Sequence, residues 1–255
     1  MCIRDSPKTG RLFKRSRQGE SGVDGVLDDY AFVAHGLLCV YRANGRARYL
    51  VAARELIDLA LAEFWDPERG GFFLTRAGAE ALFTRPRESY DGALPSGSGV
   101  MADVLVRLGL LTGEASYSER ATETLASVAS AVQQAPAGHT RSLLALDLAT
   151  QPAFEVVLVG RGGEPEFDRL VEVARRSYGG HFVLHVLDET DPESRTALQA
   201  VAPFVAGLTA EDGRAAAFVC RRFACEQPVH DAQALSERLV VGLRTDPSGS
   251  GSTGD

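Results

Sequence analysis

The residues best suited to chemistry lie in one loop, positions 85–99, with the sequence RPRESYDGALPSGSG. The loop combines the carboxylates of Glu88 and Asp91 with arginine, serine and tyrosine side chains, and an apolar segment, 100–111, follows at once. Its glycine and proline residues interrupt regular structure, and functional side chains concentrate in loops that rigid elements hold in place. The sequence therefore predicts a loop that lines a pocket at the start of a helix.

A second acidic segment, Asp28 and Asp29, precedes another apolar stretch. Carboxylates positioned near a reacting group perform general acid–base catalysis, and the positive end of a helix favours their ionised form. We therefore expect Asp29 and Asp91 in a base or electrostatic role and Glu88, in a loop with apolar neighbours, as the better general acid. For each carboxylate taken alone, capping a helix or pairing with an arginine is the commoner role.

Residues 27–150 have the periodicity of helices. Segments 29–43 and 100–111 are apolar on most sides and predict buried helices, whereas 47–64 and 116–132 are amphipathic and predict half-exposed ones. A shift of 68 positions superposes Gly45 on Gly113, Tyr49 on Tyr117 and Ala53 on Ala121. Such a repeat predicts helical hairpins with inner and outer layers, in which segments 28–29 and 96–97 begin equivalent inner helices on one face.

The second half alternates short β-rich segments with helical ones, which predicts a small α/β layer. We expect strands at 154–160, 181–187 and 215–220, helices at 165–178, 196–205 and 232–243, and a further short strand at 72–75.

Cysteine and histidine residues give weaker signals. Cys39 lies in an apolar segment and is expected to be a buried small side chain. His35, in the same segment, is expected to be a core histidine with its hydrogen bonds satisfied rather than a catalytic base. Cys220 and Cys225 are spaced C-x4-C, which favours two reduced thiols near a turn, with a disulfide or a metal site assisted by His230 as alternatives. His181 and His185 have no third ligand in register, so no metal or other cofactor is expected.

Composition excludes several classes of protein. The chain has 255 residues and a net charge of −7, which argues against nucleic acid as a partner. No apolar run is long enough for a membrane span and no signal peptide is recognisable, so we expect a cytoplasmic protein. Residues 1–9 are expected to be a non-native or disordered start, and 246–255 a disordered, low-complexity tail.

Four segments resemble the family of YyaL and the spermatogenesis-associated, thioredoxin-domain-containing proteins. They are 25–32 (GVLDDYAF), 70–73 (GGFF), 85–98 (RPRESYDGALPSGS) and 219–225 (VCRRFAC). The resemblance covers about residues 10–243. It implies a mainly α fold, in which 10–150 form part of an (α/α)6 toroid similar to the six-hairpin glycosidases and 151–245 form the α/β layer. It also implies a thioredoxin-like domain and earlier hairpins that this chain lacks.

Toroids of this class resemble sugar hydrolases and epimerases, in which two carboxyl groups act across a funnel. The resemblance therefore implies a small polyhydroxylated or anionic ligand, with Asp29, Glu88 and Asp91 as catalytic residues. The alternative is a non-catalytic interaction or regulatory domain that accompanies a redox-active thioredoxin domain. Expected ligand-binding residues are Asp28, Tyr30, Arg85, Tyr90, Ser96 and Ser98.

Overall fold

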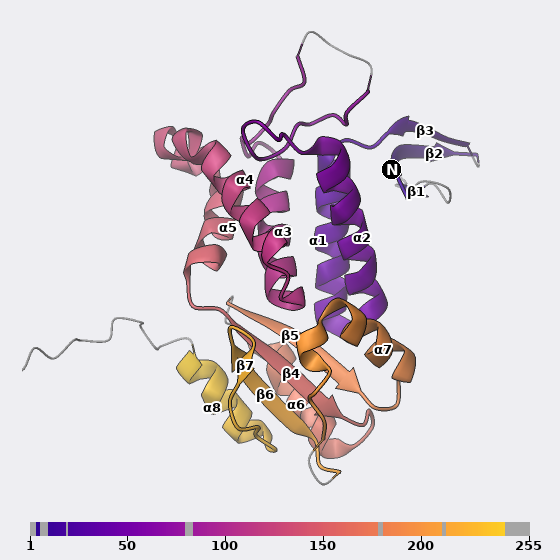
Figure 1. Ribbon diagram of the computed structural model, residues 1–255, viewed down its shortest axis with the longest axis vertical. Helices are drawn as coiled ribbons and strands as arrows, with labels where there is room; N and C mark the ends of the chain where they lie inside the picture. Colours follow the sequence, from indigo (N-terminus) through magenta and orange to yellow (C-terminus); the bar gives the residue numbers. More distant parts are fainter. Residues whose placement is uncertain are drawn as a thin grey trace, which may run out of the picture.

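The computed structural model describes residues 4–5, 10–18, 20–79, 84–177, 181–210 and 213–242. It is mainly helical, with a helical part at one end of the molecule and an α/β layer at the other (Figure 1). The helical part contains α1 (Leu27–Asn44), α2 (Ala47–Phe64), α3 (Gly97–Thr112), α4 (Ala115–Gln134), the 3-10 turn η1 (Pro136–Gly138) and α5 (Thr140–Thr150).

The predicted repeat is visible as two helical hairpins, α1–α2 and α3–α4. Gly45 and Gly113 occupy equivalent ends of α1 and α3, with φ of 74° and 77°. Each donates its N–H to a carbonyl four residues earlier, Tyr41 O and Gly109 O. Only glycine adopts this left-handed conformation without strain, so the same residue closes the same turn in both hairpins.

The layers follow the prediction in part. Helix α3 packs against α1, α4 and α5 and is buried along nearly its whole length, whereas α4 buries only Tyr117, Ala121 and Thr124. Helix α1 is not buried all round as expected, because α2 and α3 cover one face and leave Gly36, Cys39 and Val40 exposed. The prediction that Cys39 is buried is therefore wrong.

The start of the chain contains a small antiparallel sheet that the sequence did not predict. Strands β1 (Arg4–Asp5), β2 (Leu12–Arg17) and β3 (Glu20–Asp24) pair in that order. Residues 72–75 do not form the expected strand and contribute only an isolated bridge between Trp65 and Phe72. The rest of segment 1–9 and the tail from 243 onward lie outside the described residues.

The α/β layer is built on a sheet of order β5-β4-β6-β7. Strand β4 pairs in parallel with β5 and antiparallel with β6. The elements are β4 (Phe154–Gly160), α6 (Pro165–Arg176), β5 (Phe182–Asp188), α7 (Pro192–Val201), η2 (Pro203–Val205), β6 (Ala216–Arg221), β7 (Ala224–Cys225) and α8 (Ala232–Gly242).

The two faces of this sheet have different neighbours. Val156 and Leu158 point into a cluster with α6 and α8, whereas Val157 and Val159 belong to the main core shared with the helical part. Alternate strand residues point to opposite faces, so one strand anchors both layers. On the shared face, the Tyr41 hydroxyl lies 2.6 Å from Nδ1 of buried His185. Burial lowers the pKa of His185 to about 4, which keeps this ring neutral at physiological pH.

Helix length and apolar composition decide whether a helix can cross a membrane. None of the helices in the described part of the chain combines the length and apolar composition that a crossing needs.

Candidate functional site

The loop before α3 and the start of α1 meet, as the repeat predicted. Gly97, the first residue of α3, lies directly against the Asp28 carboxylate. A methyl group on Gly97 would lie 2.1 Å from Asp28 Oδ1, so any other residue would push the carboxylate away. The two inner helices therefore begin side by side, at a place that we call the mouth: Asp28, Glu88, Asp91 and residues 96–98.

Asp29 directly follows Asp28 at the start of α1, but its side chain does not face solvent. It is buried, and its Oδ2 accepts the N–H of Val26 at 2.9 Å, which caps the start of α1. The carboxylate thus satisfies a main-chain donor that the helix leaves without a partner. The observed contact of the Asp29 carboxylate is therefore the helix cap.

Asp91 is also occupied by main-chain donors. Its Oδ1 accepts the N–H of Ser96 at 2.9 Å, and its Oδ2 accepts the N–H of Arg141 at 2.7 Å and the Thr140 hydroxyl at 3.1 Å. Partial burial alone would raise the pKa of Asp91, but these hydrogen bonds outweigh burial and hold the pKa below its ordinary value. Asp91 therefore fastens the loop to the starts of α3 and α5.

Asp28 and Glu88 differ from these two carboxylates. Glu88 is exposed. Its main-chain carbonyl oxygen accepts the Ser98 hydroxyl at 2.7 Å, so this contact with α3 does not use the carboxylate. Asp28 is half-buried, and burial, together with the negative charges of Glu88 and Asp29, raises its pKa. Two carboxylates with such different surroundings are the usual arrangement for dividing acid and base roles.

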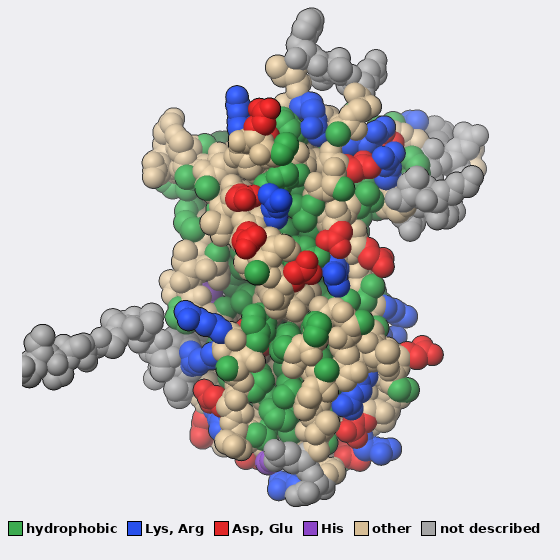
Figure 2. Space-filling model, in the orientation of Figure 1, with side chains coloured by type: hydrophobic (Ala, Val, Ile, Leu, Met, Phe, Trp, Pro, Cys, Tyr) green, Lys and Arg blue, Asp and Glu red, His purple; other side chains and the backbone are tan. Residues whose placement is uncertain are grey.

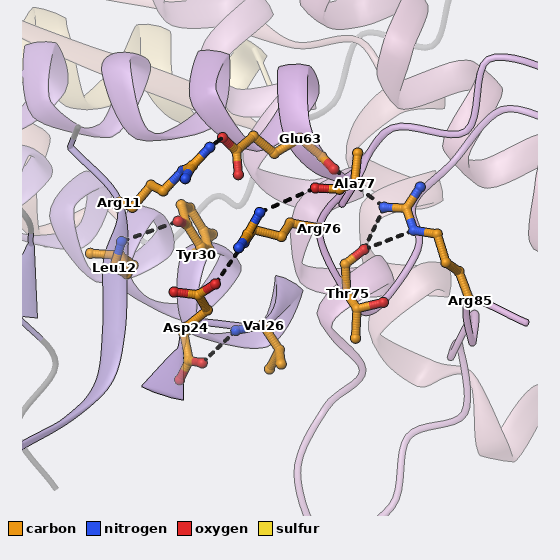
Figure 3. Close-up of polar contacts among 11 residues, drawn as sticks. Arg11, Leu12, Asp24, Val26, Tyr30, Glu63, Thr75, Arg76, Ala77 and Arg85 are labelled. Carbon is orange, nitrogen blue, oxygen red and sulfur yellow. Dashed lines mark hydrogen bonds and ion pairs between the residues drawn. The ribbon is translucent and has the colours of Figure 1, made fainter. Parts of the chain in front are cut away.

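The expected ligand-binding side chains are mostly used within the fold. The Tyr30 ring is 1% exposed and its hydroxyl accepts the N–H of Leu12 at 3.1 Å, so it cannot stack on a ligand (Figure 3). Arg85 donates to Thr75 O and Glu63 O and lies 4.0 Å above the Phe73 ring. Tyr30 and Arg85 thus have contacts within the fold, and their predicted role in ligand binding stays a prediction.

Tyr90 and the serines have clearer positions. Tyr90 is 62% exposed and meets the buried His139 ring edge-on, so its ring is open to solvent at the mouth. Ser96 caps α3 by accepting the N–H of Gly99 at 3.2 Å, and Ser98 is buried. Of the expected ligand-binding residues, Tyr30, Ser96 and Ser98 are buried, Asp28 and Arg85 are partly exposed, and Tyr90 is exposed.

Sequence reasoning missed a polar cluster between the inner helices. Asp103, 2% exposed, accepts from Arg107 Nε at 3.0 Å and from Arg141 Nη2 at 2.8 Å. His35 Nε2 lies 3.8 Å from the same carboxylate, beyond hydrogen-bond distance. The His35 side chain is 34% exposed, so the prediction of a core histidine is wrong. The signal available in the sequence was Asp103, with Arg107 one turn later, inside a largely apolar helix. On the face in Figure 2, charged side chains of both signs are scattered over the helical part.

The junction between the helices and the sheet holds a second group of polar residues. A cleft of about 1030 Å³ lies among α3, α4, the end of α5 and the β6–β7 hairpin. Glu155 on β4 lines it, and burial raises the pKa of this side chain to about 7. Cys220 and Cys225 in the hairpin form a disulfide, so the preferred prediction of two reduced thiols is wrong.

Comparisons with known proteins give the relationship of the chain. Human spermatogenesis-associated protein 20 is 30% identical over 240 residues, which are 91% of this chain and 30% of that protein. The mouse protein of the same name is 30% identical over 217 residues, 84% of this chain and 27% of that protein. The chain belongs to this family. No family model matches it.

The chain spans about 30% of the length of the spermatogenesis-associated protein 20 relatives that it matches. An uncharacterised protein of Caenorhabditis elegans is 28% identical over 86% of the chain, with a similar share, 29%, of its own length. In this member of the family, the described region contains two candidate sites: the mouth, with its two accessible carboxylates, and a separate cleft at the sheet.

Proposed function

We propose that the helical part is a section of an (α/α)6 toroid whose mouth binds a small polyhydroxylated or anionic ligand through Asp28 and Glu88. The hairpin repeat supports this architecture, since α1, α3 and α5 lie next to one another with α2 and α4 behind them. The observation that carries the proposal is the contact of Asp28 with the first turn of α3, beside Glu88 and apart from the carboxylates that cap helices.

The environments of the two carboxylates suit different roles. Asp28 has the raised pKa expected of a proton donor, and exposed Glu88 supplies the second carboxylate. This assignment exchanges the roles expected from the sequence, where Glu88 was the acid and Asp29 or Asp91 the base. The reaction class it fits is glycoside hydrolysis or sugar epimerisation, and Tyr90 provides an exposed ring against which a sugar packs.

A second candidate is a non-catalytic interaction domain. Asp29 and Asp91 are committed to main-chain donors, and Arg87 pairs with Asp66 and donates to Gly70 O. Under this alternative, the conspicuous loop serves to hold the helices together, and no small ligand binds at the mouth.

Titration calorimetry with a panel of neutral sugars, uronic acids and sugar phosphates separates the two candidates. Asp28→Asn and Glu88→Gln are expected to weaken binding at least roughly tenfold, as loss of a charged hydrogen bond predicts, with little change in melting temperature. Glu119→Gln, an exposed carboxylate on α4, is the matched control. Absence of any binder, or binding that survives both substitutions, favours the interaction domain.

A further inference from the structure

The disulfide in the β6–β7 hairpin is asymmetric. Cys220 is fully buried on β6, whereas its cross-strand partner Cys225 is exposed on β7, the edge strand of the sheet. Because thiol–disulfide exchange begins with attack on an accessible sulfur, only the Cys225 side of the bond is open to an incoming thiolate.

A buried carboxylate lies behind the disulfide. Glu155 on β4 is directly opposite Cys220 on β6 in the antiparallel register, so both side chains are on the face of the sheet toward the helices. Glu155 is 1% exposed, and its Oε2 accepts the N–H of Phe223 in the hairpin turn at 3.2 Å. The carboxyl group is thus tied to the same hairpin that contains the disulfide.

The turn between the two cysteines is held in an unusual conformation. Arg222 and Phe223 have φ of 50° and 64°, in the left-handed region that side chains other than glycine rarely adopt. The Phe223 ring packs on Phe204 at 5.0 Å, and the turn lines the cleft together with Glu155. The cleft therefore gives a reacting partner access to the exposed turn, with the buried Glu155 in its wall.

We propose that Cys220–Cys225 is a thiol–disulfide exchange site that is reduced by a dithiol, with Cys225 as the attacked sulfur and Glu155 as the proton donor to Cys220. The charged groups facing the cleft with Glu155 are Glu114, before α4, and Arg221 and Arg222 in the hairpin. The positive charges of the two arginines attract the attacking thiolate. His185, which is neutral, lies on the same face of the sheet as Glu155.

The exchange balances in two steps. One thiolate of the dithiol forms a bond to Cys225 Sγ, the Cys220–Cys225 bond breaks, and the Cys220 sulfur leaves with the electron pair and takes the proton of Glu155. The second thiol of the dithiol, as a thiolate, then attacks its own bound sulfur and releases Cys225, which takes a proton from water. The dithiol is oxidised to a disulfide, the protein disulfide is reduced to two thiols, and Glu155 regains its proton from water.

The first test is reduction of the folded chain with dithiothreitol, followed by alkylation and mass measurement. We expect both thiols to appear while the circular dichroism spectrum stays native. In single variants treated with oxidised glutathione, Cys225 in Cys220→Ser should form a mixed disulfide, and Cys220 in Cys225→Ser should react at least roughly tenfold more slowly because it is buried. Reduction that requires unfolding denaturant, or equal reactivity of the two variants, would overturn the proposal.

The second test isolates Glu155. Rates are divided by the dithiothreitol thiolate concentration at each pH, so that only the protein's own titration remains. The normalised rate is expected to fall as pH rises through about 7 and, in Glu155→Gln, to lose this dependence and be about tenfold slower at pH 6. Glu226→Gln, a half-exposed carboxylate next to Cys225, is the matched control and should retain the profile. An unchanged profile in Glu155→Gln would remove the carboxylate from the exchange.

Discussion

Asp91 at the mouth and Glu155 at the sheet junction are held in opposite ways. At the mouth, Asp91 is surrounded by donors from three residues, and its pKa is held below the ordinary value. At the junction, Glu155 is desolvated on a strand, accepts from Phe223, and its pKa is raised. Hydrogen bonds to the charged form and removal of water shift a carboxyl group in opposite directions. A carboxylate in a polar loop is thus kept ionised by its structural hydrogen bonds, whereas an acidic residue in an apolar strand is shifted toward its neutral form.

The largest change in stability is expected at a carboxylate of the helical part that pairs with two arginines. Asp103→Asn removes the charge that Arg107 and Arg141 share between α3 and α5. Leaving charged partners uncompensated in a mostly buried site should lower the free energy of unfolding by about 3 kcal/mol. Urea unfolding measures this change. Glu123→Gln, whose pair with Arg120 is on the surface, is the control and should stay within about 0.5 kcal/mol. Equal effects would contradict the importance of burial.

The next largest effect is a pH dependence of the unfolding free energy, caused by Glu155 at the sheet junction. Since the folded pKa of Glu155 is about 7 and the unfolded value is lower, the folded chain binds more protons between the two. This stabilisation is complete below the unfolded pKa and is lost as pH rises through about 7. We expect the unfolding free energy of the native chain to fall, relative to Glu155→Gln, by roughly 2 kcal/mol from pH 5 to pH 8. Parallel stability curves for the two proteins would show that Glu155 is not desolvated.

The smallest changes in unfolding free energy distinguish Asp91 from Glu88, two acidic residues of the mouth. Asp91→Asn keeps one acceptor oxygen but loses the charge, and should lower the unfolding free energy by about 1–2 kcal/mol at pH 7. Because the folded pKa is depressed, this contribution is present above the unfolded pKa and disappears as pH falls through the folded one. Glu88→Gln should change stability by less than about 0.5 kcal/mol, since the side chain is exposed. Thermal unfolding at pH 3 and pH 7 compares them, and a larger loss in Glu88→Gln would reverse the assignment.

Much of the secondary structure was predictable from local pattern. Helix 47–64 and strand 154–160 were predicted at their observed bounds, because amphipathic and β-rich periods extend without interruption between turn residues. Helix 196–205 was predicted too late, since Asp191 caps α7 and Pro192 begins it, and Pro203 starts a separate turn. The sheet at residues 4–24 was missed because its strands lack an alternating apolar pattern.

The sequence by itself determined the hairpin repeat, the pairing of the two inner-helix starts and the α/β order, because these depend on periodicity and on glycines such as Gly45 and Gly113. Only the tertiary structure decided which of two adjacent carboxylates faces out, since Asp28 meets Gly97 from α3 while Asp29 turns back to cap its own helix. It also decided that Cys220 and Cys225 are joined and that Cys220 lies opposite Glu155. Neighbours so distant in sequence are set by strand register and helix packing, which no local pattern specifies.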